Sequence, residues 1–162
     1  MLNSTNKVID LLEFKPLLIN QNRLMGLDLG KKRIGISIST LSMNGALPLR
    51  TVEENKFSDL LRNLGEIIKE YNVKGIIFGL PLNMDGTEGK SVQSVRDKAE
   101  KISIELSIKY SFWDERLSTI AVDRFYEKPN NSRAKKKVHK KEIDNLASAF
   151  ILEGALNYIM NN

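Results

Sequence analysis

The chain has 162 residues, with no cysteine and with His139 as its only histidine. This length suits one domain with its own core, and the lack of cysteine excludes a disulfide scaffold, a thiolate zinc site and a cysteine nucleophile. The net charge is +5, from 25 basic and 20 acidic residues. No apolar run is long enough to span a bilayer and the first residues do not resemble a secretory signal. We therefore expect a cytoplasmic protein without a membrane partner.

The first half of the chain predicts three strands and one helix. Residues 24–29 form a short apolar run, residues 34–38 alternate at the period of a strand, and residues 46–52 suit a third strand. The tight turn at 30–32 predicts that the first two strands form a hairpin. Helical spacing of apolar residues over 57–71 then predicts a helix.

The second half alternates strands and helices. Residues 73–80 favour a buried strand, followed by a loop rich in Gly, Pro, Asn and Asp. The later elements are predicted as a helix with Ser91 as candidate N-cap, a strand and two helices, over 92–106, 110–114, 118–126 and 141–159. Such an order implies a mixed sheet covered by helices. Residues 1–22 are expected to be an extension, with one helix over Val8 to Phe14, ahead of a domain spanning 23–162.

Basic residues concentrate in one segment, 133–141. Six of its nine residues are basic, namely Arg133, Lys135, Lys136, Lys137, Lys140 and Lys141. Without these six the chain holds 19 basic and 20 acidic residues, a net charge of −1. Such a block is typical of a phosphate-binding surface, and a solvated lysine-rich loop is the alternative interpretation.

Acidic residues stand at three places where an unpaired charge is costly. Asp28 lies within a predicted strand, where Asp is disfavoured; the alternative is an edge strand or a turn beside Gly30. Asp114 and Glu115 stand at the end of the strand 110–114, where an ion pair with Arg116 is the alternative interpretation. Successive strand residues face opposite sides, so only one of the two can face a given site unless the strand has already ended.

Asp144 is the third such acid. On a helical wheel it falls between Ile151 and Ala155, near the edge of an apolar arc that also holds Ile143 and Phe150. We therefore expect it to face the sheet, although an Asp in the first helical turn is also favoured by the helix dipole.

Carboxylates that converge at one end of a sheet repel each other unless a cation neutralises them. In a chain without cysteine the suitable cation is a hard, oxygen-bound ion, Mg²⁺ or Mn²⁺. Two such ions can support phosphodiester hydrolysis, and the adjoining basic segment would hold a polyanion near them.

Four motifs follow one another along the chain: GLDLGKKRIG at 26–35, GLPLNMDGTEG at 79–89, DERLST at 114–119 and KEIDNLA at 141–147. In this order and spacing they resemble the YqgF/RuvX family, RNase H-like proteins also described as Holliday junction resolvases or pre-16S rRNA nucleases. The resemblance implies an α/β fold of the RNase H-like, RuvC type, a mixed five-stranded sheet with helices on both faces.

The resemblance also implies a metal-dependent nuclease acting in 5′-end processing of pre-16S rRNA during ribosome biogenesis. Holliday junction resolution in DNA recombination and repair is the alternative. The implied cofactor is Mg²⁺ or Mn²⁺, and the implied partners are nucleic acid and a ribosomal precursor particle. The choice between RNA and DNA and between monomer and dimer stays open.

The resemblance also implies which residues of this chain form the site. The catalytic and metal-binding acids are Asp28, Glu115 and Asp144, with Asp114 as the alternative to Glu115. Arg33 is expected to contact phosphate together with the basic segment, and the loop residues expected to shape the site are Asn83, Thr87 and Glu88. Two features depart from the family: Ser39 and Thr40 stand where many members have an Asp, and residues 1–22 have no counterpart in most members.

Two other classes of protein share part of this pattern. An Asp-Leu-Gly strand followed by basic residues also opens actin-like ATPases and sugar kinases, but those need two such domains to close over ATP. A non-catalytic RNA-binding module that keeps the acids for structure is the other alternative. It predicts salt-sensitive RNA binding without cleavage, even with Mn²⁺.

Overall fold

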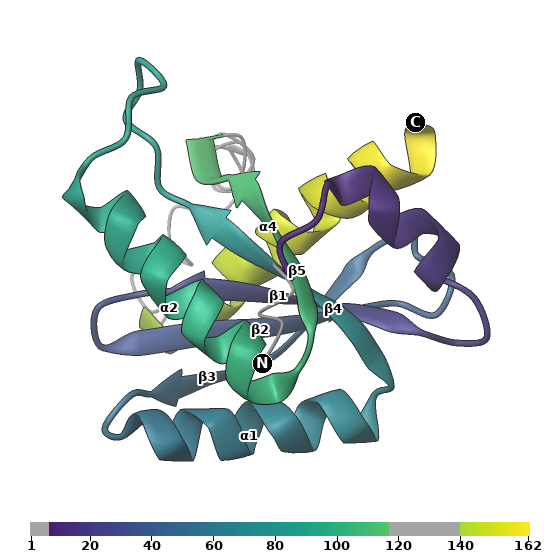
Figure 1. The fold of residues 1–162 in the computed structure, drawn as a ribbon, viewed down its shortest axis with the longest axis horizontal. Coiled ribbons are helices and arrows are strands. Elements are labelled where there is room, and N and C mark those ends of the chain that lie inside the picture. Colours follow the sequence, from purple (N-terminus) through teal and green to yellow (C-terminus); the bar gives the residue numbers. More distant parts are fainter. Residues whose placement is uncertain (1–6, 117–139) are drawn as a thin grey trace, which may run out of the picture.

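The computed structural model describes residues 7–116 and 140–162, with the side chains of 140–145 left out. At its centre lies a mixed five-stranded sheet with the order β3-β2-β1-β4-β5 (Figure 1). The strands are β1 (Arg23–Leu29), β2 (Arg33–Ser39), β3 (Ala46–Glu53), β4 (Val73–Leu80) and β5 (Lys109–Asp114). The first three pair antiparallel, whereas β1, β4 and β5 run parallel. The carboxyl ends of β1, β4 and β5 therefore meet at one edge of the sheet.

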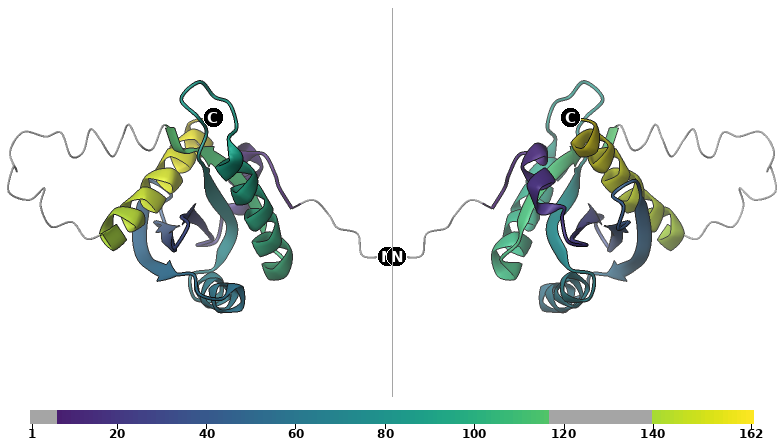
Figure 2. Two further views of the ribbon diagram at one scale, coloured as in Figure 1. Left: turned by 90° about the vertical axis from the view of Figure 1, so that its left-hand side faces the viewer. Right: turned by 90° about the vertical axis from the view of Figure 1, so that its right-hand side faces the viewer.

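Helices cover both faces of the sheet, as expected. The helices are α1 (Phe57–Glu70), α2 (Lys90–Leu106), α4 (Lys140–Asn161) and the 3₁₀ helix η1 (Leu11–Leu17). One core cluster joins α1 and α2 to one sheet face, and a second joins α4 and η1 to the other. Figure 2 shows α4 and α2 on opposite sides of the sheet. Within the described ranges, no helix has the length and apolar character needed to cross a bilayer.

The N-terminal residues 7–22, called the N-terminal strap below, pack against the domain. The predicted helix over Val8 to Phe14 is wrong, because Val8 forms a parallel bridge with Tyr110 and η1 begins only at Leu11. The amide of Ile9 donates to the Tyr110 carbonyl at 2.9 Å. Phe14 is fully buried against β4, where a Cβ on Gly75 would lie 2.1 Å from its ring. The strap thus adds a short strand to the edge of β5 and one large side chain to the core.

Two further expectations need correction or lie outside the described residues. Helix α2 has Gly89 as its N-cap, with no side-chain cap, so Ser91 is a helical residue and not the cap. The helix predicted over 118–126 and the basic residues Arg133, Lys135, Lys136 and Lys137 lie outside the described residues. Lys140 and Lys141 open α4.

Candidate active site

Asp28 lies near the carboxyl end of β1, the central strand. Its neighbours Leu27 and Leu29 pack in the core with α1 and α2. Because side chains alternate along a strand, Asp28 faces the opposite side of the sheet, which α4 covers. The strand is flanked by β2 and β4, so the alternative of an edge strand is wrong.

Glu115 reaches this side of the sheet from β5, across the intervening strand β4. A Cβ on Gly79, in β4, would lie 2.5 Å from Glu115 Oε1 and 2.5 Å from Ile151 Cδ1 in α4. The Glu115 side chain therefore passes over Gly79, under α4, toward β1. Only a residue without a side chain leaves this space, and the two carboxylates meet there through a side-chain hydrogen bond between Glu115 and Asp28.

The electrostatics of the pair follow from this placement. Burial, then the charge of Asp28, the hydrogen bond with it and the charge of Asp114 together raise the pKa of Glu115 from 4.5 to about 7. At pH values below about 7 and without a metal, Glu115 therefore keeps a proton, which it donates to Asp28. A divalent cation would neutralise the two carboxylates in place of this proton.

Asp114 has a different partner. Arg116 Nε donates to Asp114 Oδ1 at 3.0 Å and to Oδ2 at 2.9 Å, and Arg116 Nη2 lies 2.6 Å from Oδ2. The hydrogen bond from Arg116 lowers the pKa of Asp114. Of the two candidates for the middle acid, the structure brings Glu115 to Asp28 and holds Asp114 on Arg116.

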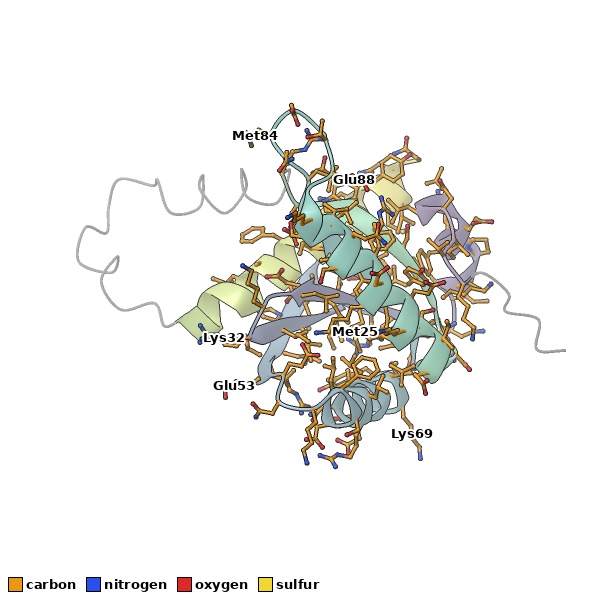
Figure 3. All side chains as sticks on the ribbon, turned by 60° about the vertical axis from the view of Figure 1, so that its left-hand side comes forward. Met25, Lys32, Glu53, Lys69, Met84 and Glu88 are labelled. Carbon is orange, nitrogen blue, oxygen red and sulfur yellow. The ribbon has the colours of Figure 1, made fainter. Side chains whose placement is uncertain are left out.

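The loop 81–89 projects from the sheet beside this pair, with Met84 at its tip 86% exposed (Figure 3). Asn83 Nδ2 donates to Thr87 Oγ1 at 3.0 Å, and its backbone amide donates to the Thr87 carbonyl at 2.9 Å. Glu88 forms an ion pair with Arg96 of α2 at 2.6 Å. Arg116 Nη1 donates to the Met84 carbonyl at 3.3 Å, so the residue that holds Asp114 also holds the loop.

Helix α4 packs closely on β1 and β2. A Cβ on Gly26 would lie 2.8 Å from the Ser148 carbonyl and 2.8 Å from Leu152 Cβ. Ser37 Oγ in β2 donates to that Ser148 carbonyl at 2.9 Å. Asp144 precedes Ser148 by four residues, about one helical turn. The placement of its carboxylate lies outside the described side chains and stays a prediction.

The buried face of α4 differs from the predicted apolar arc. Among the side chains described for this helix, from residue 146 onward, the buried ones are Ser148, Ala149, Ile151, Leu152, Ala155, Leu156 and Ile159. Phe150, expected inside the arc, is only half-buried. The reason is that α4 packs directly on Gly26 through Ser148 and Leu152. This contact turns the small and apolar residues around these two toward the sheet.

Arg33 opens β2 and lies directly across from Glu53 of β3. A cavity of about 380 Å³ separates the hairpin turn from the end of β3, with Arg33 and the exposed Lys31 and Lys32 on one side and Glu53 and Glu54 on the other. Arg33 therefore lies in a surface of mixed charge, and its contact with phosphate stays a prediction.

Sequence reasoning missed Gly79, which provides the passage for Glu115. It belongs to a quoted motif, but only the strand register shows that it lies between β1 and β5. The ion pair expected with Arg116 is confirmed for Asp114, and the further contact of Arg116 with the loop was not foreseen. In the described side chains, 7–116 and 146–162, no three His, Cys, Asp or Glu residues gather as a metal-ligand set.

Solved structures share this architecture. RuvC of T. thermophilus, solved with a Holliday junction substrate, gives a TM-score of 0.55 at 12% identity, over 85% of this chain and 95% of RuvC. The yeast mitochondrial Holliday junction resolvase Ydc2 gives 0.53 at 13% identity, over 91% of this chain and 85% of its own. At such low identity the likeness concerns the fold alone. The fold is the RNase H-like fold of RuvC-type resolvases, as expected.

Sequence relatives define the family more closely. Residues 22–158 match the family RuvX, described as Holliday junction resolvase. A protein of Beijerinckia indica named "Putative pre-16S rRNA nuclease" is 42% identical over 151 residues, covering 93% of this chain and 90% of the relative. One of the same name from Pelagibacter ubique is 40% identical over 154 residues, covering 95% of this chain and 100% of the relative. The chain belongs to the RuvX family.

These two matches also bear on the N-terminal strap. At 151 and 154 residues, both are longer than the domain predicted over 23–162, so both extend into residues 1–22. Part of this segment therefore has a counterpart in these two relatives, whereas the expectation for most members of the family stays a prediction.

Proposed function

We propose that this protein is a divalent-metal-dependent nuclease that hydrolyses phosphodiester bonds with Asp28 and Glu115 at its active site. The observation that carries the proposal is the meeting of these two carboxylates across Gly79. Holding two acids together under a helix costs free energy, and perturbed carboxyl pairs of this kind are concentrated at functional sites. Membership of the RuvX family supports the same reaction class.

The chemistry of this pair suits a hard cation. Asp28 and Glu115 would hold Mg²⁺ or Mn²⁺ through carboxylate oxygens, and we propose Asp144 of α4 as the third ligand. When bound, the metal would activate water and stabilise the leaving oxygen. Asp114 would act indirectly, by fixing Arg116 and through it the loop 81–89, with Asn83 and Thr87 keeping the loop closed.

The substrate that we propose is the precursor of 16S rRNA, trimmed at its 5′ end within a ribosomal precursor particle. The names of the relatives at about 40% identity support this choice. The phosphate chain would lie along the basic residues that precede Asp144, namely Arg133, Lys135, Lys136, Lys137, Lys140 and Lys141, with Arg33 as a further contact. A cytoplasmic location stays a prediction of the sequence.

Holliday junction cleavage is the second candidate. It is favoured by the description of the RuvX family and by the likeness to RuvC, a protein solved on a junction. A four-way DNA junction therefore belongs in any assay of this protein beside the RNA substrates.

The test is a cleavage assay with a pre-16S 5′ leader, a four-way DNA junction and an unstructured single-stranded RNA, each with Mg²⁺ or Mn²⁺. We expect cleavage of the leader, abolished by EDTA and by Asp28→Asn. Asp59→Asn, a surface acid of α1 paired with Arg62, is the matched control and should cleave normally. Cleavage that survives Asp28→Asn or EDTA would refute the proposed site. RNA binding without cleavage under every condition would instead identify a binding module.

A further inference from the structure

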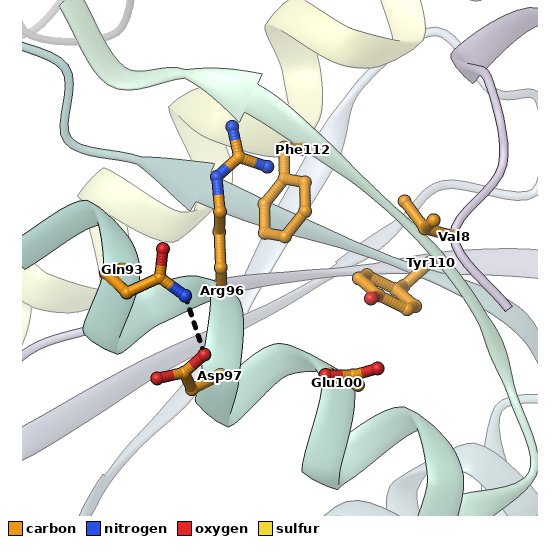
Figure 4. Close-up of a pocket in the computed structure, with 7 residues that line it drawn as sticks. All are labelled: Val8, Gln93, Arg96, Asp97, Glu100, Tyr110 and Phe112. Carbon is orange, nitrogen blue, oxygen red and sulfur yellow. Dashed lines mark hydrogen bonds between the residues drawn. The ribbon is translucent and has the colours of Figure 1, made fainter. Parts of the chain in front are cut away.

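A small cavity lies between α2 and β5, on the sheet face opposite Asp28 and Glu115 (Figure 4). Its volume is about 190 Å³, room for one side chain. Tyr110 and Phe112 of β5 belong to the core on the α1 and α2 side, whereas Trp113, one residue further, packs on the α4 side. The cavity is therefore separate from the proposed active site.

The base of the cavity is aromatic. The rings of Tyr110 and Phe112 stand edge to face with their centres 5.5 Å apart. The guanidinium of Arg96 lies 5.0 Å from the centre of the Phe112 ring, and its charge is paired with Glu88. This surface thus already holds one guanidinium of the chain by a cation–π contact.

The rim of the cavity is acidic. Asp97 and Glu100 are three residues apart on α2, so they lie on one side of the helix. Gln93 Nε2 donates to Asp97 Oδ1 at 2.8 Å. In the described part of the chain, no lysine or arginine forms an ion pair with Asp97 or Glu100. Because Glu88 neutralises Arg96, the one cation among the described residues that line the cavity, these two carboxylates leave the rim with a local negative charge.

The hydroxyl of a tyrosine completes the cavity. Tyr110 is 6% exposed and lines the cavity. Among the described residues its hydroxyl has no hydrogen-bond partner, and the oxygen is not fully enclosed, so a ligand in the cavity can reach it. Burial first, and then the charge of Glu100, raise the pKa of Tyr110, so the hydroxyl keeps its proton in the field of this carboxylate.

We propose that this cavity binds an arginine side chain of a basic partner protein. A guanidinium is planar, stacks on aromatic rings and carries five donors that carboxylates and a hydroxyl can accept. The acidic rim disfavours the phosphates of a nucleic acid. Val8 of the N-terminal strap forms one wall, so the strap shapes the cavity as well as the edge of β5.

The proposal can be tested by NMR on the full-length, isotope-labelled protein with N-acetyl-arginine amide as the probe. We expect saturable shifts of the Gln93 side-chain amide and of the Tyr110 and Phe112 rings. The citrulline analogue has the same shape without the charge and should bind at least about tenfold more weakly. Equal binding of the two probes would show that the cavity does not recognise the charge of the guanidinium and would refute the proposal.

Substitutions of the two rim carboxylates test whether arginine binds at this cavity. Asp97→Asn combined with Glu100→Gln should weaken arginine binding at least about tenfold, whereas Glu105→Gln, an exposed acid of the same helix, should not. Tyr110→Phe keeps the ring and should cause a smaller loss. An unchanged affinity in the double variant would overturn the proposal, and so would stronger shifts of the same resonances by guanosine monophosphate. All variants should keep nuclease activity, so failure here is distinct from failure of the proposed function.

Discussion

Glu115 is held where its charge is unfavourable in the absence of a metal. In the unfolded chain it would titrate near its ordinary value of 4.5, and in the folded protein near 7, because of burial and Asp28. Between these pH values the folded protein binds more protons than the unfolded chain. The free energy of unfolding of the metal-free protein therefore falls as pH rises through this window, by at most about 3 kcal/mol.

Glu115→Gln should remove this effect. In EDTA at about pH 8 we expect the variant to be more stable than the wild type, and at about pH 5, where Glu115 is protonated when folded, nearly equal to it. Urea unfolding at the two pH values measures the difference. Asp114→Asn is the control with the opposite sign, because Arg116 lowers the pKa of Asp114 and the ionised form is the stabilising one. A Glu115→Gln variant that is less stable at pH 8 contradicts the shared-proton description.

Gly79→Ala should separate activity from stability. Its new Cβ would lie 2.5 Å from Glu115 Oε1 and from Ile151 Cδ1, both at the ends of flexible side chains. The side chains can move at a cost of about 1–3 kcal/mol, but Glu115 then leaves Asp28. We expect a folded protein with cleavage reduced at least about tenfold, the scale of a small misplacement of a catalytic group.

The matched control is Gly65→Ala in α1, where the nearest atom to the new Cβ is Leu106 Cδ2 at 3.8 Å. Alanine is favoured over glycine within a helix by about 0.5–1 kcal/mol, so this variant should be slightly stabilised and fully active. Thermal unfolding and the cleavage assay on both variants check the pair. Normal activity of Gly79→Ala would show that the passage over β4 is not needed.

At the scale of elements, the N-terminal strap has a structural role that its position ahead of the sheet did not suggest. The first three residues of the strap, Lys7, Val8 and Ile9, pair with the edge strand β5. They cover an edge that could otherwise pair with another chain. Beyond this pairing, Asp10 and Glu13 form a capping box that starts η1. That start orients Phe14 into the core.

Phe14→Ala should therefore cost about 3–5 kcal/mol of unfolding free energy, the range for a fully buried phenylalanine. Leu12→Ala, in the same 3₁₀ helix but 37% exposed, should cost much less. Chemical denaturation of both variants compares them. Equal losses would mean that the strap contributes by its backbone pairing alone.

At the scale of the molecule, the excess of positive charge is concentrated in one segment of the sequence, residues 133–141, which precedes Asp144. Changing Lys135, Lys136 and Lys137 to Glu should weaken nucleic-acid binding for all sequences and flatten its dependence on salt. Changing the exposed Lys69, Lys74 and Lys109 to Glu alters the net charge equally and is the control. Binding measured at several salt concentrations distinguishes them, and an equal effect of both triple variants would indicate that only net charge matters.

Much of this architecture could be predicted from the sequence, because periodicity reports directly on strands and amphipathic helices. The strands around Asp28 and Glu115 and the last helix lie within a few residues of their predicted bounds. Periodicity does not reveal the close contacts that a glycine allows because it has no side chain. The close approach of α4 to Gly26 sets which face of α4 is buried, and the apolar pattern alone indicated a different one.

The choice between Asp114 and Glu115 shows the same limit. Strand parity permits only one of them to face a site, but it does not say which. Which of the two meets Asp28 depends on Arg116, which binds Asp114, and on Gly79, which makes room for Glu115. Both facts are properties of neighbouring strands and become visible only once β4 lies between β1 and β5.

Helix α4 is the last element of the chain, and yet it covers β1, β2 and β3, the first three strands. During translation the strands leave the ribosome well before this helix. Until residues 146–159 follow, apolar residues such as Leu24 and Ile77 lack the cover of α4, and Ile151 cannot hold Glu115 in place. We therefore expect a nascent chain to be unable to cut RNA, so that the enzyme would become active only after its own messenger has been read to the end of this helix.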